Sequence, residues 1–147
     1  MNTFLPYPSF ADSARVLDDK RLRSQIDEAN QILDALLNLA TGWRNHPAAV
    51  MWRGSETYLL QYGMACVQQL RERGQDRLSG YELEAVQEYP NTFGMPRDCV
   101  RPPWLGVDCF HRSHQSNLLR KNPKHYGRFF CDVPDDLPYV WPRGAKC

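Results

Sequence analysis

The sequence predicts an all-α fold, and three observations lead to this class. Apolar residues recur at intervals of three and four positions in two long stretches, which is the spacing of one helix face. No stretch shows the strict alternation of a strand, and proline and glycine separate the helical stretches from irregular ones. The 147 residues suit one domain. We therefore expect a single compact helical domain over residues 1–147, with three to four main helices and long irregular loops.

The first main helix is predicted near residues 13–40. Its apolar stripe consists of Leu22, Ile26, Ala29, Leu33, Leu36 and Ala40. Asp12 or Ser13 is the expected N-terminal cap, and Gly42 is the expected residue just past the C-terminus. Because Asp18 or the next residue can also cap a helix, a break near residue 18 stays open.

A second helix is predicted near residues 48–73 and a third near residues 110–121. The second begins after Asn45-His46-Pro47, with Asn45 as cap, and ends at Gly74; Gly54 is expected to lie inside it. Its stripe consists of Trp52, Leu59, Tyr62, Cys66 and Leu70. A short helix is possible over residues 81–89.

The two ends of the chain are rich in proline. Pro6 and Pro8 exclude a regular helix from the apolar lead-in over residues 1–10, which we expect to pack into the fold. Prolines interleaved with Tyr139 and Trp141 predict that residues 131–147 form an extended tail over the surface.

Composition excludes several classes of protein. Eighteen basic and 17 acidic residues give a net charge of +1, which excludes a uniformly basic surface but not a local basic patch. No apolar run is long enough for a membrane span and no signal peptide is evident, so a cytoplasmic protein is expected. Five widely spaced cysteines indicate reduced thiols. The spacing of Cys99, Cys109, His111 and His114 matches no standard zinc pattern, so neither a metal nor a cofactor is expected.

The most informative segment is residues 110–128, which contains five basic residues and no acid. Basic side chains mixed with hydroxyls and rings are typical of surfaces that contact phosphates and stack on bases. The residues predicted to bind DNA here are Arg112, His114, Ser116, Arg120, Lys121, Lys124, His125, Tyr126 and Arg128. The alternative interpretation is a solvated basic helix followed by a turn.

Two smaller groups also indicate a site. Arg44, Asn45, His46 and Arg53 surround a predicted helix start, where free N–H groups suit a phosphate; a simple helix cap is the alternative. Arg21, Gln25 and Glu28 form a polar line beside the apolar stripe of the first helix. A buried amide needs a partner or an open site, so this line is either a site or a structural hydrogen-bond network.

Several segments resemble the pyrimidine-dimer DNA glycosylases of the phage endonuclease V type. They are Asp27-Glu28-Ala29-Asn30-Gln31-Ile32-Leu33, Gly42-Trp43-Arg44-Asn45-His46-Pro47, Leu70-Arg71-Glu72-Arg73-Gly74, Ser113-His114-Gln115-Ser116-Asn117-Leu118-Leu119-Arg120-Lys121 and Lys124-His125-Tyr126-Gly127-Arg128. The resemblance covers roughly residues 1–74 and 110–130, and it depends on the order and spacing of these segments. It implies a small all-α domain whose N-terminal segment threads between helices.

The resemblance also implies a chemistry. In the family an N-terminal α-amine attacks the sugar C1′ and forms a Schiff base, a glutamate on the first helix assists, and a base is extruded from the duplex. Met1 falls at the nucleophile position, and Gln25 falls where the family carries its glutamate. Glu28 lies about one turn further on, and Arg21 lies about one turn before Gln25. These four residues are the predicted catalytic set.

The resulting hypothesis is a DNA repair N-glycosylase and abasic-site lyase. Its partner would be double-stranded DNA with a damaged or modified base, and the protein is expected to be a monomer with no membrane partner. Two alternatives stay open: a DNA-binding module on the same scaffold without the reaction, and another enzyme acting on modified pyrimidines.

Overall fold

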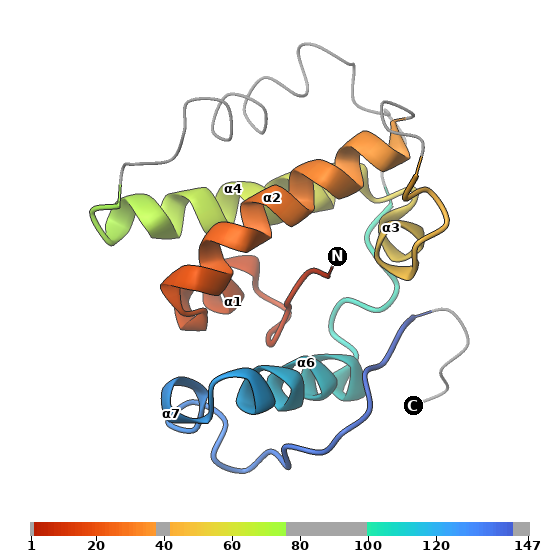
Figure 1. Ribbon diagram of the computed structural model, residues 1–147. Helices are drawn as coiled ribbons and strands as arrows, with labels where there is room; N and C mark the ends of the chain where they lie inside the picture. The colour runs from red at the N-terminus through yellow and green to blue at the C-terminus, as the bar shows by residue number, and fades with distance from the viewer. Residues whose placement is uncertain (1, 38–41, 76–99, 143–147) are drawn as a thin grey trace.

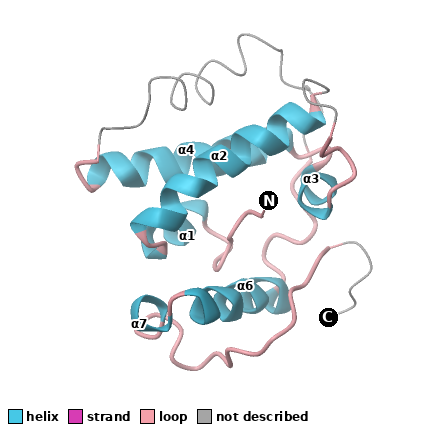
Figure 2. Cartoon of the chain, viewed as in Figure 1, coloured by secondary structure: helices cyan, strands magenta, loops and turns pink. Residues whose placement is uncertain are grey.

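The computed structural model describes residues 2–37, 42–75 and 100–142. Residue 1 and residues 38–41, 76–99 and 143–147 lie outside the described part of the chain, and with them the short helix predicted over residues 81–89. Within the described residues there are six helices and no strand, which confirms the all-α prediction (Figures 1 and 2). The helices are α1 (Phe10–Val16), α2 (Asp19–Leu36), α3 (Pro47–Trp52), α4 (Glu56–Glu72), α6 (Asp108–Lys121) and α7 (Pro123–Tyr126).

The first predicted helix is two helices. The break that the sequence left open occurs at Asp18, whose carboxylate accepts a hydrogen bond from the Arg21 backbone N–H at 2.9 Å and caps α2. The predicted caps of the first helix were wrong, because Ser9 caps α1 three or four residues earlier. The predicted C-terminus was also wrong: α2 ends at Leu36, so Gly42 is not its terminating glycine.

The second predicted helix is also interrupted. Gly54 adopts φ +82°, a left-handed conformation that favours glycine, and it separates α3 from α4 instead of lying inside a helix. His46, not Asn45, caps α3, because its Nδ1 accepts from the Ala48 N–H at 3.2 Å. The predicted stop at Gly74 is confirmed by φ +71° directly after the end of α4.

The third predicted helix is confirmed as α6, which starts two residues earlier than predicted and ends at Lys121, with Asn122 as its C-terminal cap. Asn122 also caps α7 by accepting from the His125 N–H at 3.2 Å. Residues 131–142 contain no helix, as predicted for the tail. The tail lies along α6, because Leu137 N–H donates to the Ser116 hydroxyl and Val140 N–H donates to that of Ser113.

The N-terminal segment lies between two groups of helices (Figure 1). Helix α2 packs chiefly against α4, α1 also packs against α4, and α7 adjoins α6 on the other side of the segment. Thr3, Phe4, Leu5 and Pro6 are buried, which confirms that the described part of the lead-in packs into the fold. Met1 lies outside the described residues. The apolar core therefore includes the N-terminal segment as well as the contacts between helices.

The sequence also predicted reduced cysteines and no membrane-spanning segment. Cys66 and Cys131 are free thiols, but Cys109 is disulfide-bonded, so the prediction of reduced thiols was wrong for Cys109. None of the described helices has the length and apolar character needed to cross a bilayer. Among the described residues, no three His, Cys, Asp or Glu side chains gather as metal ligands.

Candidate active site

The amide of Gln25 pairs with the backbone of the N-terminal segment. Its Oε1 accepts from the Phe4 N–H at 2.7 Å, and its Nε2 donates to the Asn2 carbonyl at 3.2 Å. The same Oε1 lies 2.7 Å from the Tyr62 hydroxyl, which also donates to the Phe4 carbonyl. Gln25 is 1% exposed. One side-chain amide therefore satisfies a donor and an acceptor two residues apart, as a neighbouring strand would.

Two histidines on α6 hold the peptide groups of Leu5. Leu5 N–H donates to His114 Nδ1 at 3.0 Å, and the Leu5 carbonyl lies 2.8 Å from His111 Nδ1. His111 Nε2 accepts from the Gly106 N–H, so its proton sits on Nδ1 and is donated to Leu5. Burial lowers the pKa of both imidazoles, that of His114 to about 3. Both rings are therefore neutral near pH 7 and fix the segment without adding charge.

Further side chains also hold the N-terminal segment in place. The Thr3 hydroxyl accepts from Trp52 Nε1 at 3.0 Å, and Gln115 Nε2 donates to the Pro6 carbonyl at 2.8 Å. In the tail, the Tyr139 hydroxyl donates to the Asn2 side-chain carbonyl. Contacts from α2, α3, α4, α6 and the tail thus converge on residues 2–6. Because so many independent groups hold it, the position of this segment is set by the whole fold.

The carboxylate of Glu28 binds Asn2, the first residue that the structure describes. Its Oε2 accepts from the Asn2 N–H at 3.0 Å, one helical turn from Gln25. The segment therefore runs along α2 from Gln25, which holds Phe4, toward Glu28, which holds Asn2. Both polar ends of the Gln25 amide thus bind the backbone of the segment, whereas the Glu28 carboxylate binds Asn2, the described residue nearest to the start of the chain.

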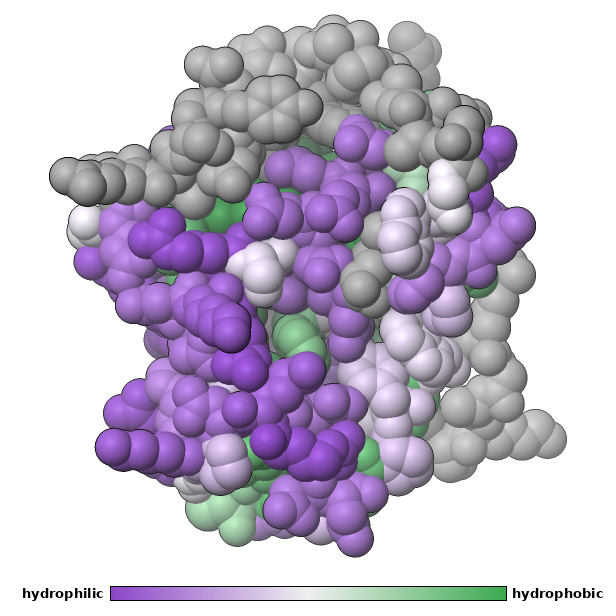
Figure 3. Space-filling view, viewed as in Figure 1, coloured by the Kyte–Doolittle hydropathy of each residue, from purple (hydrophilic) through white to green (hydrophobic). Residues whose placement is uncertain are grey.

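These groups open onto a cleft of about 420 Å³ between the first half of α2 and the end of α6. It is lined by Asn2, Phe4, Lys20, Arg21, Ser24, Gln25, Glu28, Asn117 and Lys121. Three of the lining side chains are cationic and one is a carboxylate. The face that α2 and α6 present in Figure 3 is mainly hydrophilic and is hollowed between them. The excess of cationic side chains means that such a cleft suits an anionic ligand.

Within the cleft, the three cations are held differently. Arg21 Nη1 lies 2.6 Å from Asp18 Oδ2, which also accepts from the Tyr126 hydroxyl at 2.9 Å. Burial alone would raise the pKa of the Asp18 carboxyl, but the hydrogen bonds from Arg21 and Tyr126 outweigh it and hold that pKa below its ordinary value. Lys121 lies with its Nζ 5.8 Å from the centre of the Phe4 ring, and Lys20 is exposed. Arg21 is thus fixed, while both lysines can follow a ligand.

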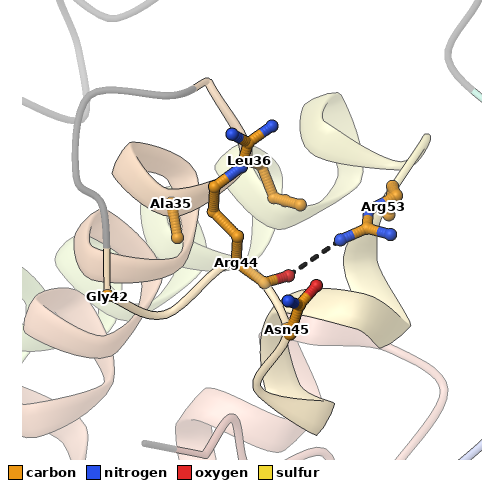
Figure 4. Close-up of a pocket in the computed structure, with 6 residues that line it drawn as sticks. All are labelled: Ala35, Leu36, Gly42, Arg44, Asn45 and Arg53. Atoms are coloured by element: carbon orange, nitrogen blue, oxygen red, sulfur yellow. Dashed lines mark hydrogen bonds between the residues drawn. The ribbon is translucent and has the colours of Figure 1, made fainter.

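A second pocket, of about 510 Å³, lies at the other end of α2 (Figure 4). Arg44, Asn45 and Arg53 line it with Ala35 and Leu36. The Arg53 guanidinium donates to the Arg44 carbonyl at 2.8 Å and fixes this loop, while both arginines and Asn45 are exposed. At 1.5 Å per residue, about 22 Å of helix separates Arg21 from Leu36.

His46 differs from its neighbours at this pocket, because its Nδ1 is used as the cap of α3. Its ring is half-buried and packs edge-on against Trp43 and Trp141, with centroids 5.3 Å and 6.2 Å away. A helix cap was the alternative interpretation of this group, and it is present at His46, one residue later than the predicted Asn45.

The structure divides the residues of segment 110–128 that were predicted to bind DNA. His114, Ser116 and Tyr126 are fully buried, so these three predictions are corrected: none can reach a phosphate while the fold is intact. Their polar groups serve Leu5, the tail and Asp18 instead. Sequence alone could not show this, because the same donors suit a phosphate or a backbone carbonyl.

The basic side chains of this segment also differ in what they bind. Arg120 Nη1 donates to the carbonyls of Asp135 and Leu137. Arg112 faces Asp132, His125 Nε2 lies 2.8 Å from the Val16 carbonyl, and Arg128 donates to the His125 carbonyl. Lys121 and Lys124 are exposed. These two lysines are the side chains of the segment most available to an external phosphate.

Lys20 and Ser24 line the cleft but were not predicted from the sequence, whereas Asn117, another lining residue, was expected among the polar donors of segment 110–128. A signal was present, because Lys20, Ser24 and Glu28 follow one another at intervals of four, as do Asn117 and Lys121, and so share helix faces. The sequence does not show that these two faces meet across the N-terminal segment.

This protein is therefore of a helical class in which a polar, cationic cleft is built around the protein's own N-terminal segment. A family model described as pyrimidine dimer DNA glycosylase matches residues 1–83, more than half of the chain. The chain belongs to this family, so it has a pyrimidine dimer DNA glycosylase-type function, with DNA as the substrate that this implies. No curated protein and no solved structure matches the chain.

Proposed function

We propose that this protein is a DNA N-glycosylase and abasic-site lyase acting on a damaged or modified base in duplex DNA. The α-amine of Met1 is the nucleophile in this proposal, and Glu28 is the carboxylate that assists it. The observation that carries the proposal is the 3.0 Å hydrogen bond from the Asn2 N–H to Glu28 Oε2.

Covalent geometry links that contact to the amine. Three bonds join the nitrogen of residue 1 to that of residue 2, so the two atoms are at most about 4 Å apart. A free α-amine has a pKa near 8, so a useful fraction is unprotonated near neutral pH. In this proposal Glu28, whose carboxylate binds the next backbone nitrogen along the chain, accepts a proton from the amine and stabilises positive charge on the sugar.

The steps follow from these positions. The amine lone pair attacks C1′, and the base leaves with the electrons of the glycosidic bond and takes up a proton. Loss of the amine proton and opening of the sugar ring then give the Schiff base, from which loss of a C2′ proton expels the 3′ phosphate. Arg21 and the two lysines of the cleft would bind the flanking phosphates.

Gln25 has a different part in this proposal from the one implied by the resemblance. As a neutral amide it cannot act as a carboxylate base, and both ends of it already bind Asn2 and Phe4. Gln25 is a positioning residue that sets the register of the N-terminal segment against α2. Glu28 takes the role of carboxylate because residue 2 lies beside it.

The two pockets along α2 are proposed to contact one duplex. About 22 Å of helix corresponds to about six base pairs at 3.4 Å each. Arg44, Asn45 and Arg53 would then bind phosphates about half a turn away from the cleft. We propose that one domain, acting as a monomer, makes both contacts.

Borohydride trapping on abasic duplex DNA tests the proposal. Protein whose free N-terminus is confirmed by intact mass should give a covalent complex, and selective N-terminal acetylation should abolish it. Glu28→Gln should slow trapping at least tenfold, whereas Asp27→Asn, the adjacent carboxylate on the exposed side of α2, should change it less than twofold. Equal trapping by acetylated and free protein would exclude the amine.

One observation favours a second candidate function. The amide at position 25 leaves the family's glutamate position without a carboxylate, which is the expected state of a DNA-binding module that lacks the reaction. Such a protein would bind duplex DNA but give no trapped complex. The same experiment therefore separates the two functions.

A further inference from the structure

Tyr126 on α7 is fully buried, but its hydroxyl binds a residue far away in the sequence. It donates to Asp18 Oδ2 at 2.9 Å and accepts from the Asp18 backbone N–H at 3.1 Å. The ring itself stacks on Phe130, with the two centroids 6.0 Å apart. A phenylalanine would make the same ring contact, so what the hydroxyl adds is the contact with Asp18. These two hydrogen bonds join α7 to the start of α2.

Asp18 connects Tyr126 to Arg21. Its Oδ1 accepts from the Arg21 backbone N–H at 2.9 Å, and its Oδ2, the oxygen that binds Tyr126, lies 2.6 Å from Arg21 Nη1. The guanidinium carbon of Arg21 also lies 6.0 Å from the centre of the Tyr126 ring. The side chains of Arg21 and Asp18 are only 18% and 13% exposed, so this ion pair is screened less than one at the surface. Through Asp18, one buried hydroxyl therefore restricts the guanidinium of Arg21.

The rest of the Arg21 guanidinium is left for a ligand of the cleft, which Arg21 lines from α2. Its Nε and Nη2 make no hydrogen bond to any residue that the structure describes. A guanidinium has five N–H donors, so it can hold Asp18 with one nitrogen and a phosphate oxygen with the others. Helix α7 stands on the other side of the N-terminal segment from α2 (Figure 1). The Tyr126–Asp18 contact therefore also connects the two groups of helices between which the cleft lies.

We propose that Tyr126 is a positioning residue that, through Asp18, holds the Arg21 guanidinium in the conformation that binds a phosphate of the DNA backbone. An arginine that is already fixed loses less conformational freedom when DNA binds, so the effect is on affinity rather than on bond breaking. Tyr126 itself touches no substrate, because it is buried. This inference rests on the proposed function, in which Arg21 binds a flanking phosphate, and adds to it a residue from the other side of the N-terminal segment.

Asp18→Asn is the sharpest test, because positioning and simple charge predict opposite results. Asparagine caps a helix as well as aspartate does, so α2 keeps its start. The amide has only one oxygen, so while Oδ1 caps the helix, Nδ2 faces the donors of Arg21 and Tyr126 and releases the guanidinium. The Kd for a duplex with a tetrahydrofuran abasic analogue, which forms no Schiff base, should rise at least fivefold. If Asp18 acted only through its negative charge, its removal would lower that Kd instead.

Tyr126→Phe removes only the hydroxyl and keeps the ring. The Kd for the analogue should rise about threefold, whereas the single-turnover rate of incision of an abasic duplex at saturating protein should stay within about twofold of the wild-type rate. Tyr58→Phe is the matched control. The half-buried Tyr58 on α4 makes no hydrogen bond through its hydroxyl to any residue that the structure describes, so this change should leave the Kd within about 1.5-fold.

Repeating both changes in an Arg21→Ala background separates positioning from a general loss of structure. Without the guanidinium, Asp18→Asn and Tyr126→Phe should each change the Kd by less than about 1.5-fold. Equal rises in Kd with and without Arg21, no rise in either variant, or a fall in Kd for Asp18→Asn would overturn the proposal. Failure of the proposed function is distinguishable, because the wild-type protein would then bind the analogue but leave the abasic duplex intact.

Discussion

The N-terminal segment and the basic segment of α6 and α7 differ in how many polar groups they carry and in what those groups bind. Residues 2–6 carry few functional groups, yet side chains from four helices and the tail hold them beside the cleft. Residues 110–128 carry many cations and hydroxyls, yet most of these bind the chain itself. The comparison shows that a segment with little chemistry of its own can define a site, because the fold directs other residues toward it.

Gln25→Glu is the change expected to break this comparison most strongly. The variant keeps the shape but replaces the Nε2 donor, so an oxygen faces the Asn2 carbonyl and a charge is buried. We expect the free energy of unfolding to fall by about 3 kcal/mol and trapping on abasic DNA to fall at least tenfold. Denaturant unfolding and trapping rates measure the two effects.

A glutamate at position 25 that raised the trapping rate would contradict the positioning role. Gln31→Glu, on the exposed side of the same helix, is the matched control and should be nearly neutral in both assays.

The neutral histidines that bind Leu5 predict a loss of stability in acid. The pKa of His114 in the fold, about 3, is below the ordinary value near 6.5, so the unfolded chain binds more protons between these values. The stability contributed by the neutral ring is therefore fully present above pH 6.5 and is lost as the pH falls toward 3. Between pH 7 and pH 4 the loss should be about 3 kcal/mol, at 1.36 kcal/mol per pH unit below 6.5.

His114→Gln isolates this contribution. An amide carbonyl can accept from the Leu5 N–H but does not titrate, so the variant should lose about 3 kcal/mol less than the wild-type protein over the same range. Denaturant melts at pH 7, 5.5 and 4 give the slope. Parallel pH profiles for the two proteins would show that His114 does not hold the segment as a neutral ring.

Salt dependence of DNA binding sharpens the comparison at the basic segment. Each phosphate contact contributes about 0.9 to the slope of log affinity against log salt. Lys121→Ala with Lys124→Ala should therefore lower the slope by about 2, because both side chains are exposed. Arg120→Ala should leave the slope within about 0.5, since its guanidinium binds the tail. If the lysine changes and Arg120→Ala lowered the slope equally, the whole of segment 110–128 would contact DNA and this division of the segment would be wrong.

The sequence predicted the helical class, the helix stop at Gly74 and the burial of the lead-in, because periodicity, glycine and proline act locally. It could not predict the break at Gly54, since helical spacing continues across a residue whose φ only the fold reveals. At the site, the line of Arg21, Gln25 and Glu28 was visible along one helix. The division of labour between Gln25 and Glu28 was not, because it depends on where residues 2–4 lie against that helix.

Locating the trapped adduct tests the central claim most directly. After borohydride reduction on abasic DNA, proteolysis and mass spectrometry identify the peptide that carries the sugar. The account predicts the adduct on the α-amine of the peptide that begins with Met1. An adduct on the Nζ of Lys20 or Lys121, the two lysines that line the same cleft, would contradict it.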